Sequence, residues 1–164
     1  MNNNIIDKIE CIIDADQNSI REFKSGKIDK TELQKRTQIN IDFIKNIINQ
    51  YGFPFIDTTS PKAYKAAFLA VQHSEDIDLM EKVIQIFKNS SSDQIERRDL
   101  AFMIDRLRVL KNMPQIFGTQ YKIEDREIKF LPIENEKVID AKRKEFSMES
   151  FAEYKKLIHD TLCT

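Results

Sequence analysis

The sequence predicts a mainly α-helical fold, a single-domain helical bundle over residues 1–164 that carries one small β-hairpin. Its length of 164 residues is close to the roughly 150 residues of one domain. With only 3 glycines and 4 prolines, a many-turned β-sandwich or barrel is unfavourable. Apolar residues recur at steps of three and four along most of the chain, which is the period of an amphipathic helix.

Two amphipathic helices open the chain. The first closes near Gly26. The second ends at Gly52, because glycine takes the left-handed conformation cheaply and Pro54 prevents the helix from continuing. Their apolar faces are Ile5, Ile9, Ile12, Ile20 and Phe23 in the first helix, and Leu33, Ile41, Ile44, Ile48 and Tyr51 in the second. The apolar connector Phe53-Pro54-Phe55 follows, and we expect it to pack on the core.

The third helix starts at Ser60-Pro61, since serine caps a helix and proline fits its first turn. It runs from Ala63 to about His73 and is apolar nearly all round, which predicts a central, buried helix. A fourth helix starts at Asp76 or Asp78. Its inward positions are Met80, Val83, Ile84 and Phe87.

A fifth helix follows the break at Ser90-Ser91-Ser92. Asp93 and Glu96 have the spacing of a capping box and predict a helix from there to about Lys111. Pro114 ends the helical pattern.

A change of period then predicts a β-hairpin over Gln115 to Ile133. Phe117, Thr119, Tyr121 and Ile123 alternate along its first strand, and Ile128 and Phe130 pair back across Glu124-Asp125-Arg126-Glu127. Two short helices complete the chain. Asn135 is the expected cap of one that runs to about Phe146, and Ser147 that of one through Leu162.

Composition excludes several classes of protein. A formal net charge of -1 provides no electrostatic footprint for nucleic acid, and we expect neither nucleic-acid nor membrane partners. The longest apolar run, Ala66 to Val71, is far shorter than the ~20 residues of a membrane helix. Cys11 and Cys163 are expected to be free thiols in a reducing compartment. We therefore expect a cytoplasmic protein, with secretion without a cleaved signal left open.

The chain contains none of the strong catalytic signatures. A Gly-rich phosphate loop, HExxH, a CxxC pair and GxSxG are all absent from the sequence. Its 2 histidines rule out a multi-histidine metal site within one chain, whereas a carboxylate-based site remains open. We expect no cofactor.

Polar side chains on faces that should be apolar mark the candidate site. Asp16 lies between Ile12 and Ile20 on the face of the first helix, with Gln17 and Arg21 beside it. A buried carboxylate without a partner is costly. Asp16 is therefore either a functional residue or one that caps a helix or pairs with an arginine.

His73 and Arg106 are further candidates. His73 ends the most buried helix and can act as an acid, a base or a nucleophile, or it bonds to the last carbonyls of its helix. Asp105 and Arg106 are adjacent in the fifth helix, and Arg106 lies between two apolar residues. Its guanidinium suits a carboxylate or phosphate ligand, or it forms a structural ion pair.

The segment Gln115-Ile116-Phe117-Gly118-Thr119-Gln120 is the most unusual one. Gly118 weakens a strand unless another backbone or a ligand approaches it closely. Gln115, Thr119 and Gln120 can donate and accept hydrogen bonds, as ligand recognition requires. The alternative is a β-bulge whose amides are satisfied internally.

These positions resemble a family of bacterial proteins known only as a domain of unknown function. Its pattern reads DQxxxR, YG(W/F)P, QH, DR, Qx(Y/F)GTQ and DxxR before a terminal helix with a tyrosine. The matching positions here are Asp16-Gln17 with Arg21, Tyr51-Gly52-Phe53-Pro54, Val71-Gln72-His73, Asp105-Arg106, Gln115 to Gln120, and Asp140 with Arg143 before Tyr154. Phe53 and Phe117 replace a tryptophan and a tyrosine, and Ser147 replaces a glycine. The resemblance implies that these polar positions belong together, and it supplies no reaction.

Two functions are compatible with these residues. The first is a hydrolase or transferase that acts on a small anionic substrate. It assigns catalysis to His73, Asp16 and Asp105, and substrate binding to Gln17, Arg21, Arg106, Gln115, Thr119, Gln120 and Arg143. The alternative is a non-catalytic ligand-binding or protein-interaction module, such as an effector, immunity or regulatory protein, whose polar residues form a buried network. An open pocket favours the first function and a sealed polar cluster the second.

Overall fold

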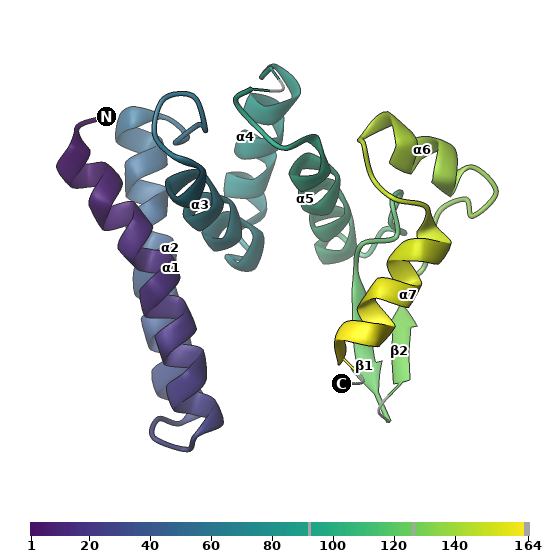
Figure 1. Cartoon of the computed structure of the whole chain (residues 1–164), viewed down its shortest axis with the longest axis horizontal. Coiled ribbons are helices and arrows are strands. Elements are labelled where there is room, and N and C mark those ends of the chain that lie inside the picture. The colour runs from purple at the N-terminus through teal and green to yellow at the C-terminus, as the bar shows by residue number, and fades with distance from the viewer. Residues whose placement is uncertain (92, 126, 163–164) are drawn as a thin grey trace. The chain divides into compact units, whose positions relative to one another are not determined.

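The computed structural model describes residues 1–91, 93–125 and 127–162, and in these it has seven α-helices and one two-stranded antiparallel sheet (Figure 1). The predicted mainly α-helical fold with one β-hairpin is thereby confirmed. Contacts between Cα atoms group Met1–Ile95 into one compact unit and the chain from Glu96 onward into a second. Each unit is described by itself, and the expectation of a single domain stays a prediction.

The first unit consists of four capped helices. These are α1 (Asn3–Lys24), α2 (Lys30–Tyr51), α3 (Pro61–His73) and α4 (Ile77–Lys88). Each begins after a side chain that accepts a hydrogen bond from the backbone N–H three residues on, and these caps are Asn2, Asp29, Ser60 and Asp76. Such a cap satisfies an N–H that has no partner within the helix. The predicted starts of the third and fourth helices are confirmed.

Helix α3 is the centre of the first unit. It packs against α1, α2 and α4, and most of its side chains are buried, as its apolar sequence predicts. The connector after α2 covers one side of this core. Phe53 is 4% exposed, and its ring meets that of Phe87 edge-on with 4.9 Å between the centroids. The expected packing of the connector is confirmed.

The second unit consists of three helices and the hairpin. Its elements are α5 (Arg97–Leu110), β1 (Tyr121–Glu124), β2 (Glu127–Phe130), α6 (Ile139–Glu145) and α7 (Phe151–Leu162). The hairpin pairs Tyr121 with Phe130 and Ile123 with Ile128, in the register that the alternating pattern predicts. Ala101, Phe117 and Met148 are buried together in its core.

The predicted start of the fifth helix is wrong. Helix α5 begins at Arg97 after Glu96, which makes no side-chain cap bond, so Asp93 does not open it. The N–H groups of Gln94 and Ile95 instead turn back to the Ser91 carbonyl, and the Gln94 carbonyl accepts the N–H of Ile56. The bond from Ile56 occupies the Gln94 carbonyl, which would accept an intrahelical N–H if the helix began at Asp93.

The first predicted strand is too long. Residues 115–120 form a loop, and only Gln115 makes an isolated bridge, to Ile133. Side chains bind several backbone N–H and C=O groups of this loop. These groups are therefore not available for the hydrogen bonds of a β-ladder. We refer to residues 115–120 as the 115–120 loop.

The starts of the last two helices also differ from the prediction. Asn135 accepts the N–H of Lys137 and closes a turn, while α6 begins only at Ile139. Helix α7 is capped by Ser150, whose hydroxyl accepts the N–H of Glu153. The Glu153 carboxylate in turn accepts the N–H of Ser150, which completes a capping box. Ser147 is not a cap.

Candidate functional site

A small pocket that opens to solvent lies between α1, α2 and α3, and its empty space of about 400 Å³ includes open solvent. One face of each helix contributes, because the lining residues recur at helical spacing. The lining is Ile12, Ile13, Asp16 and Gln17 from α1, Thr37, Asn40 and Ile41 from α2, and Ala66, Leu69, Ala70 and His73 from α3. An apolar wall with a few convergent polar groups is typical of a small-molecule site.

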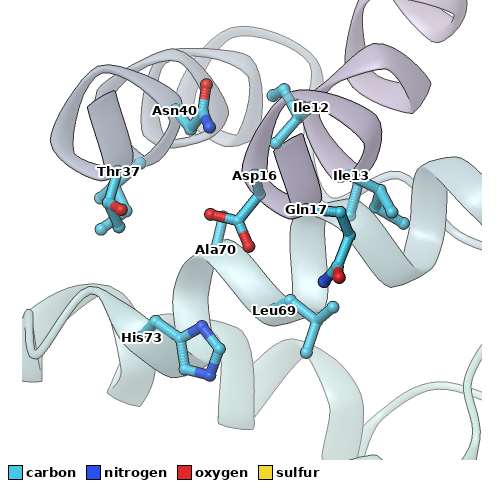
Figure 2. Close-up of a pocket in the computed structure, with 11 residues that line it drawn as sticks. Ile12, Ile13, Asp16, Gln17, Thr37, Asn40, Leu69, Ala70 and His73 are labelled. Atoms are coloured by element: carbon cyan, nitrogen blue, oxygen red, sulfur yellow. The ribbon is translucent and has the colours of Figure 1, made fainter. Parts of the chain in front are cut away.

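Asp16 occupies the centre of the polar part of this pocket. Figure 2 shows its carboxylate projecting from α1 toward α3, with Asn40 and Thr37 on the α2 side. Asp16 is half-buried, yet its carboxylate makes no hydrogen bond or ion pair to any described residue. The alternative in which Asp16 caps a helix or pairs with an arginine therefore has no support in the described residues.

His73 is the last residue of α3 and lines the same pocket. Its side chain is exposed, and Figure 2 shows the ring on the α3 side, across the pocket from α1. Gln17 also lines the pocket, and its amide extends toward Leu69. Asp16, Gln17 and His73 are thus the three sequence-predicted residues that line one pocket.

Asp105 is fully buried in the second unit and binds the 115–120 loop. One carboxylate oxygen accepts the N–H of Ile116 at 2.7 Å and that of Phe117 at 3.1 Å. The other accepts the N–H and the hydroxyl of Thr119, each at 3.0 Å. Burial raises the pKa of the Asp105 carboxyl, and the bonds from the Ile116, Thr119 and Phe117 amides oppose that rise.

The Gln115 side chain links the first and last residues of the 115–120 loop by hydrogen bonds. Its side-chain amide donates to the carbonyls of Gln120 and Leu131 at 2.9 and 2.7 Å, and its side-chain oxygen accepts the Gln120 N–H at 2.8 Å. The Gln120 amide donates to the Thr119 hydroxyl at 3.0 Å. The side chains of Gln115, Thr119 and Gln120 therefore make these hydrogen bonds within the protein, to the loop, to Leu131 and to Asp105.

Arg143 fixes the middle of the loop from α6. Its guanidinium is 0% exposed and donates to the Phe117 carbonyl at 2.6 Å and the Glu149 carbonyl at 2.7 Å. It also lies 4.7 Å from the centre of the Tyr154 ring. Burial lowers the pKa of Arg143 and raises that of Tyr154 to about 12.

The sequence-predicted residues thus fall into two groups in separate units. The pocket contains Asp16, Gln17 and His73, and the network of the second unit contains Asp105, Gln115, Thr119, Gln120 and Arg143. Arg21 is exposed on α1 outside the pocket lining, and Arg106 is half-buried on α5.

Sequence reasoning missed Thr37 and Asn40, which line the pocket from α2. The signal that could have found them is their spacing of three residues beside Ile41 on the edge of an apolar face. It also missed Glu149, whose carbonyl binds Arg143. Among the described residues, no group of three or more His, Cys, Asp or Glu side chains could hold a metal ion.

A family model described as a family of unknown function (DUF6624) matches residues 9–164, almost the whole chain. The chain belongs to this family. No curated protein and no solved structure matches this DUF6624 protein. The predicted domain of unknown function is confirmed, while the motif pattern and the bacterial origin stay predictions. None of the described helices of the DUF6624 protein is both long and apolar enough to cross a membrane.

Proposed function

We propose that this DUF6624 protein binds a small polar molecule in the pocket between α1, α2 and α3 and acts on it by proton transfer. The reaction class is that of a hydrolase or a transferase. One observation carries the proposal: the Asp16 carboxylate, which has no partner among the described residues, and the exposed His73 imidazole line one solvent-open pocket from two different helices.

The lining residues supply the parts of acid–base catalysis. A histidine side chain ordinarily titrates near neutrality, so His73 takes a proton from a water or a substrate hydroxyl. The Asp16 carboxylate stabilises the positive charge that this step creates. Gln17, Asn40 and Thr37 supply amides and a hydroxyl for the orientation of the substrate.

The basic residues expected to bind an anion are not part of this lining. Arg21 lies outside it, and Arg143 is enclosed in the second unit by its bonds to two carbonyls. The proposal therefore places proton transfer in the pocket without an anion-binding arginine.

The test combines a binding screen with a screen for turnover. The whole chain is screened by NMR against a fragment library, and against chromogenic esters, phosphate esters, glycosides and amides for activity. We expect a hit that shifts the pocket amides and a turnover that His73→Ala reduces at least about 100-fold, the usual contribution of a general acid or base. His159→Ala is the matched control, since His159 is exposed on α7. Turnover that survives in His73→Ala would refute the catalytic assignment.

A second candidate function is non-catalytic binding, and the network of the second unit favours it. Asp105, Gln115 and Arg143 are each 0% exposed and bound to the protein's own backbone. A buried polar network of this kind specifies packing. In this case a pocket ligand binds equally well to the wild type and to His73→Ala, and no substrate class is turned over.

A further inference from the structure

The charge of the pocket points to a class of ligand. We infer that the pocket selects a small organic cation, a protonated amine attached to an apolar group, over an anion of the same size. This inference rests on the proposed function, because it concerns the ligand of the same pocket.

The first argument is that three basic side chains on the helices that form the pocket are paired with carboxylates outside it. Arg36 of α2 binds Glu22 at 2.6 Å and Glu32 at 2.9 Å. Lys62 of α3 binds Asp14 at 2.8 Å. These basic side chains meet carboxylates outside the pocket, so they do not neutralise Asp16.

Lys45 of α2 binds Asp76, the cap of α4, and is likewise engaged elsewhere. Arg21 of α1 is exposed and is not among the residues that line the pocket. Among the described lining residues there is no lysine or arginine. No lysine or arginine among the described lining residues therefore offsets the negative charge of Asp16.

The second argument is the chemistry of the remaining wall. Ile12, Ile13 and Leu69 provide an apolar surface next to the carboxylate, and the side-chain amides of Gln17 and Asn40 can each donate and accept hydrogen bonds. An ammonium group presents three N–H donors and no acceptor. It suits the Asp16 carboxylate, because a hydrogen bond between two charged groups is charge-assisted. An anion would instead meet the charge of Asp16.

His73 is the lining residue that can gain a positive charge. The measurement is therefore made at pH 8, where a histidine is ordinarily neutral and an alkylamine protonated. The charge of the pocket then depends on Asp16, and the comparison of ligands reports on that carboxylate.

The experiment titrates the ¹⁵N-labelled whole chain with three probes of similar size: butylammonium, 1-butanol and butyrate. The amide signals of Asp16, Gln17 and Asn40 report binding. We expect butylammonium to bind at least about tenfold more tightly than butyrate, because a hydrogen bond to a charged group is worth more than a neutral one. We expect Asp16→Asn to remove that preference.

Asp7→Asn is the matched control. Asp7 is exposed on α1, and nine residues place it about 180° around the helix from Asp16. We expect this variant to keep the preference for butylammonium.

The outcomes separate the two levels of the proposal. If none of the three probes shifts the pocket amides, the pocket is not a ligand site and the proposed function fails with the inference. If 1-butanol or butyrate binds as tightly as butylammonium, the pocket stands and the cation selectivity is refuted. Equal loss of preference in Asp7→Asn and Asp16→Asn also refutes it, since the effect is then one of net charge.

Discussion

The Asp105 carboxylate accepts two hydrogen bonds from Thr119, one from its backbone N–H and one from its hydroxyl, each 3.0 Å long. With the N–H groups of Ile116 and Phe117, these bonds tie the 115–120 loop to α5. An acid that sequence reasoning assigns to catalysis is therefore engaged in holding a loop in place.

Thr119→Val should destabilise the protein by about 1–2 kcal/mol. The Thr119 hydroxyl donates to Asp105 and accepts from the Gln120 side chain, so its removal leaves a buried carboxylate and an amide short of a partner. Urea unfolding followed by circular dichroism measures the change. Thr119→Ser keeps the hydroxyl, so it should reduce the free energy of unfolding by less than Thr119→Val does. Equal losses in the two variants would show that the methyl group, and not the hydrogen bonds, accounts for the stability.

Gly118→Ala should be among the most destabilising single substitutions, at about 2–4 kcal/mol. A Cβ at Gly118 would lie 2.6 Å from the ring of Phe151 and 2.9 Å from Ile139, and its φ of +68° disfavours any side chain. Gly26→Ala is the control, since Gly26 has a φ of +73° but nothing within 4 Å of the added Cβ. Gly26→Ala should reduce stability only by the roughly 1–2 kcal/mol that a left-handed backbone conformation costs a residue with a side chain. The difference between the two thermal melts isolates the packing, and its absence would contradict the close contact.

Ser147→Gly should stabilise the protein by about 0.5–1 kcal/mol. Ser147 has a φ of +54°, a left-handed conformation that costs an ordinary residue energy and costs glycine almost none. Ser25→Gly, at a φ of -85°, should give no gain. Differential scanning calorimetry measures both, and a lower melting temperature for Ser147→Gly would contradict the expectation.

Asp76→Asn should reduce stability at neutral pH and lose its effect in acid. The hydrogen bond from Lys45, followed by that from the Leu79 N–H, lowers the pKa of Asp76 from its usual 3.8. A lowered folded pKa gives stability that is present above the unfolded value and disappears as the pH falls through the folded one. Asparagine keeps the cap of α4 and removes the charge. Urea unfolding at pH 7 and at pH 2 measures the difference between variant and wild type. A difference that is as large at pH 2 would contradict the role of the charge.

The helices of the first unit could be predicted because their signals are local. Ser60-Pro61 and Asp76 lie directly before the helices they start, and Gly52 directly after the one it ends. The 115–120 loop could not be predicted in the same way. Its backbone groups bind Asp105, which lies 11–14 residues earlier, and Arg143, 26 residues from Phe117. An alternating pattern contains no information about such partners.

The candidate site was predictable in part, for the same reason. Asp16 and His73 stood out as polar residues on or at the end of apolar helices, and both line the pocket. Thr37 and Asn40 did not, because a hydroxyl and an amide at the edge of an apolar face are common on any helix. Asp105 and Arg143 stood out equally, yet their partners are backbone groups that no side-chain pattern reveals.

The packing of the Phe151 ring against Gly118 has a consequence for synthesis on the ribosome. Phe151 and Tyr154 belong to α7, and the Tyr154 hydroxyl reaches the Thr119 carbonyl across 35 residues of chain. A nascent chain that has not yet extended to α7 lacks the Phe151 ring that packs over Gly118, so this part of the loop is exposed to water. Because synthesis adds roughly 5–20 residues per second, this part of the loop stays uncovered for seconds, during which chaperones and proteases can reach it.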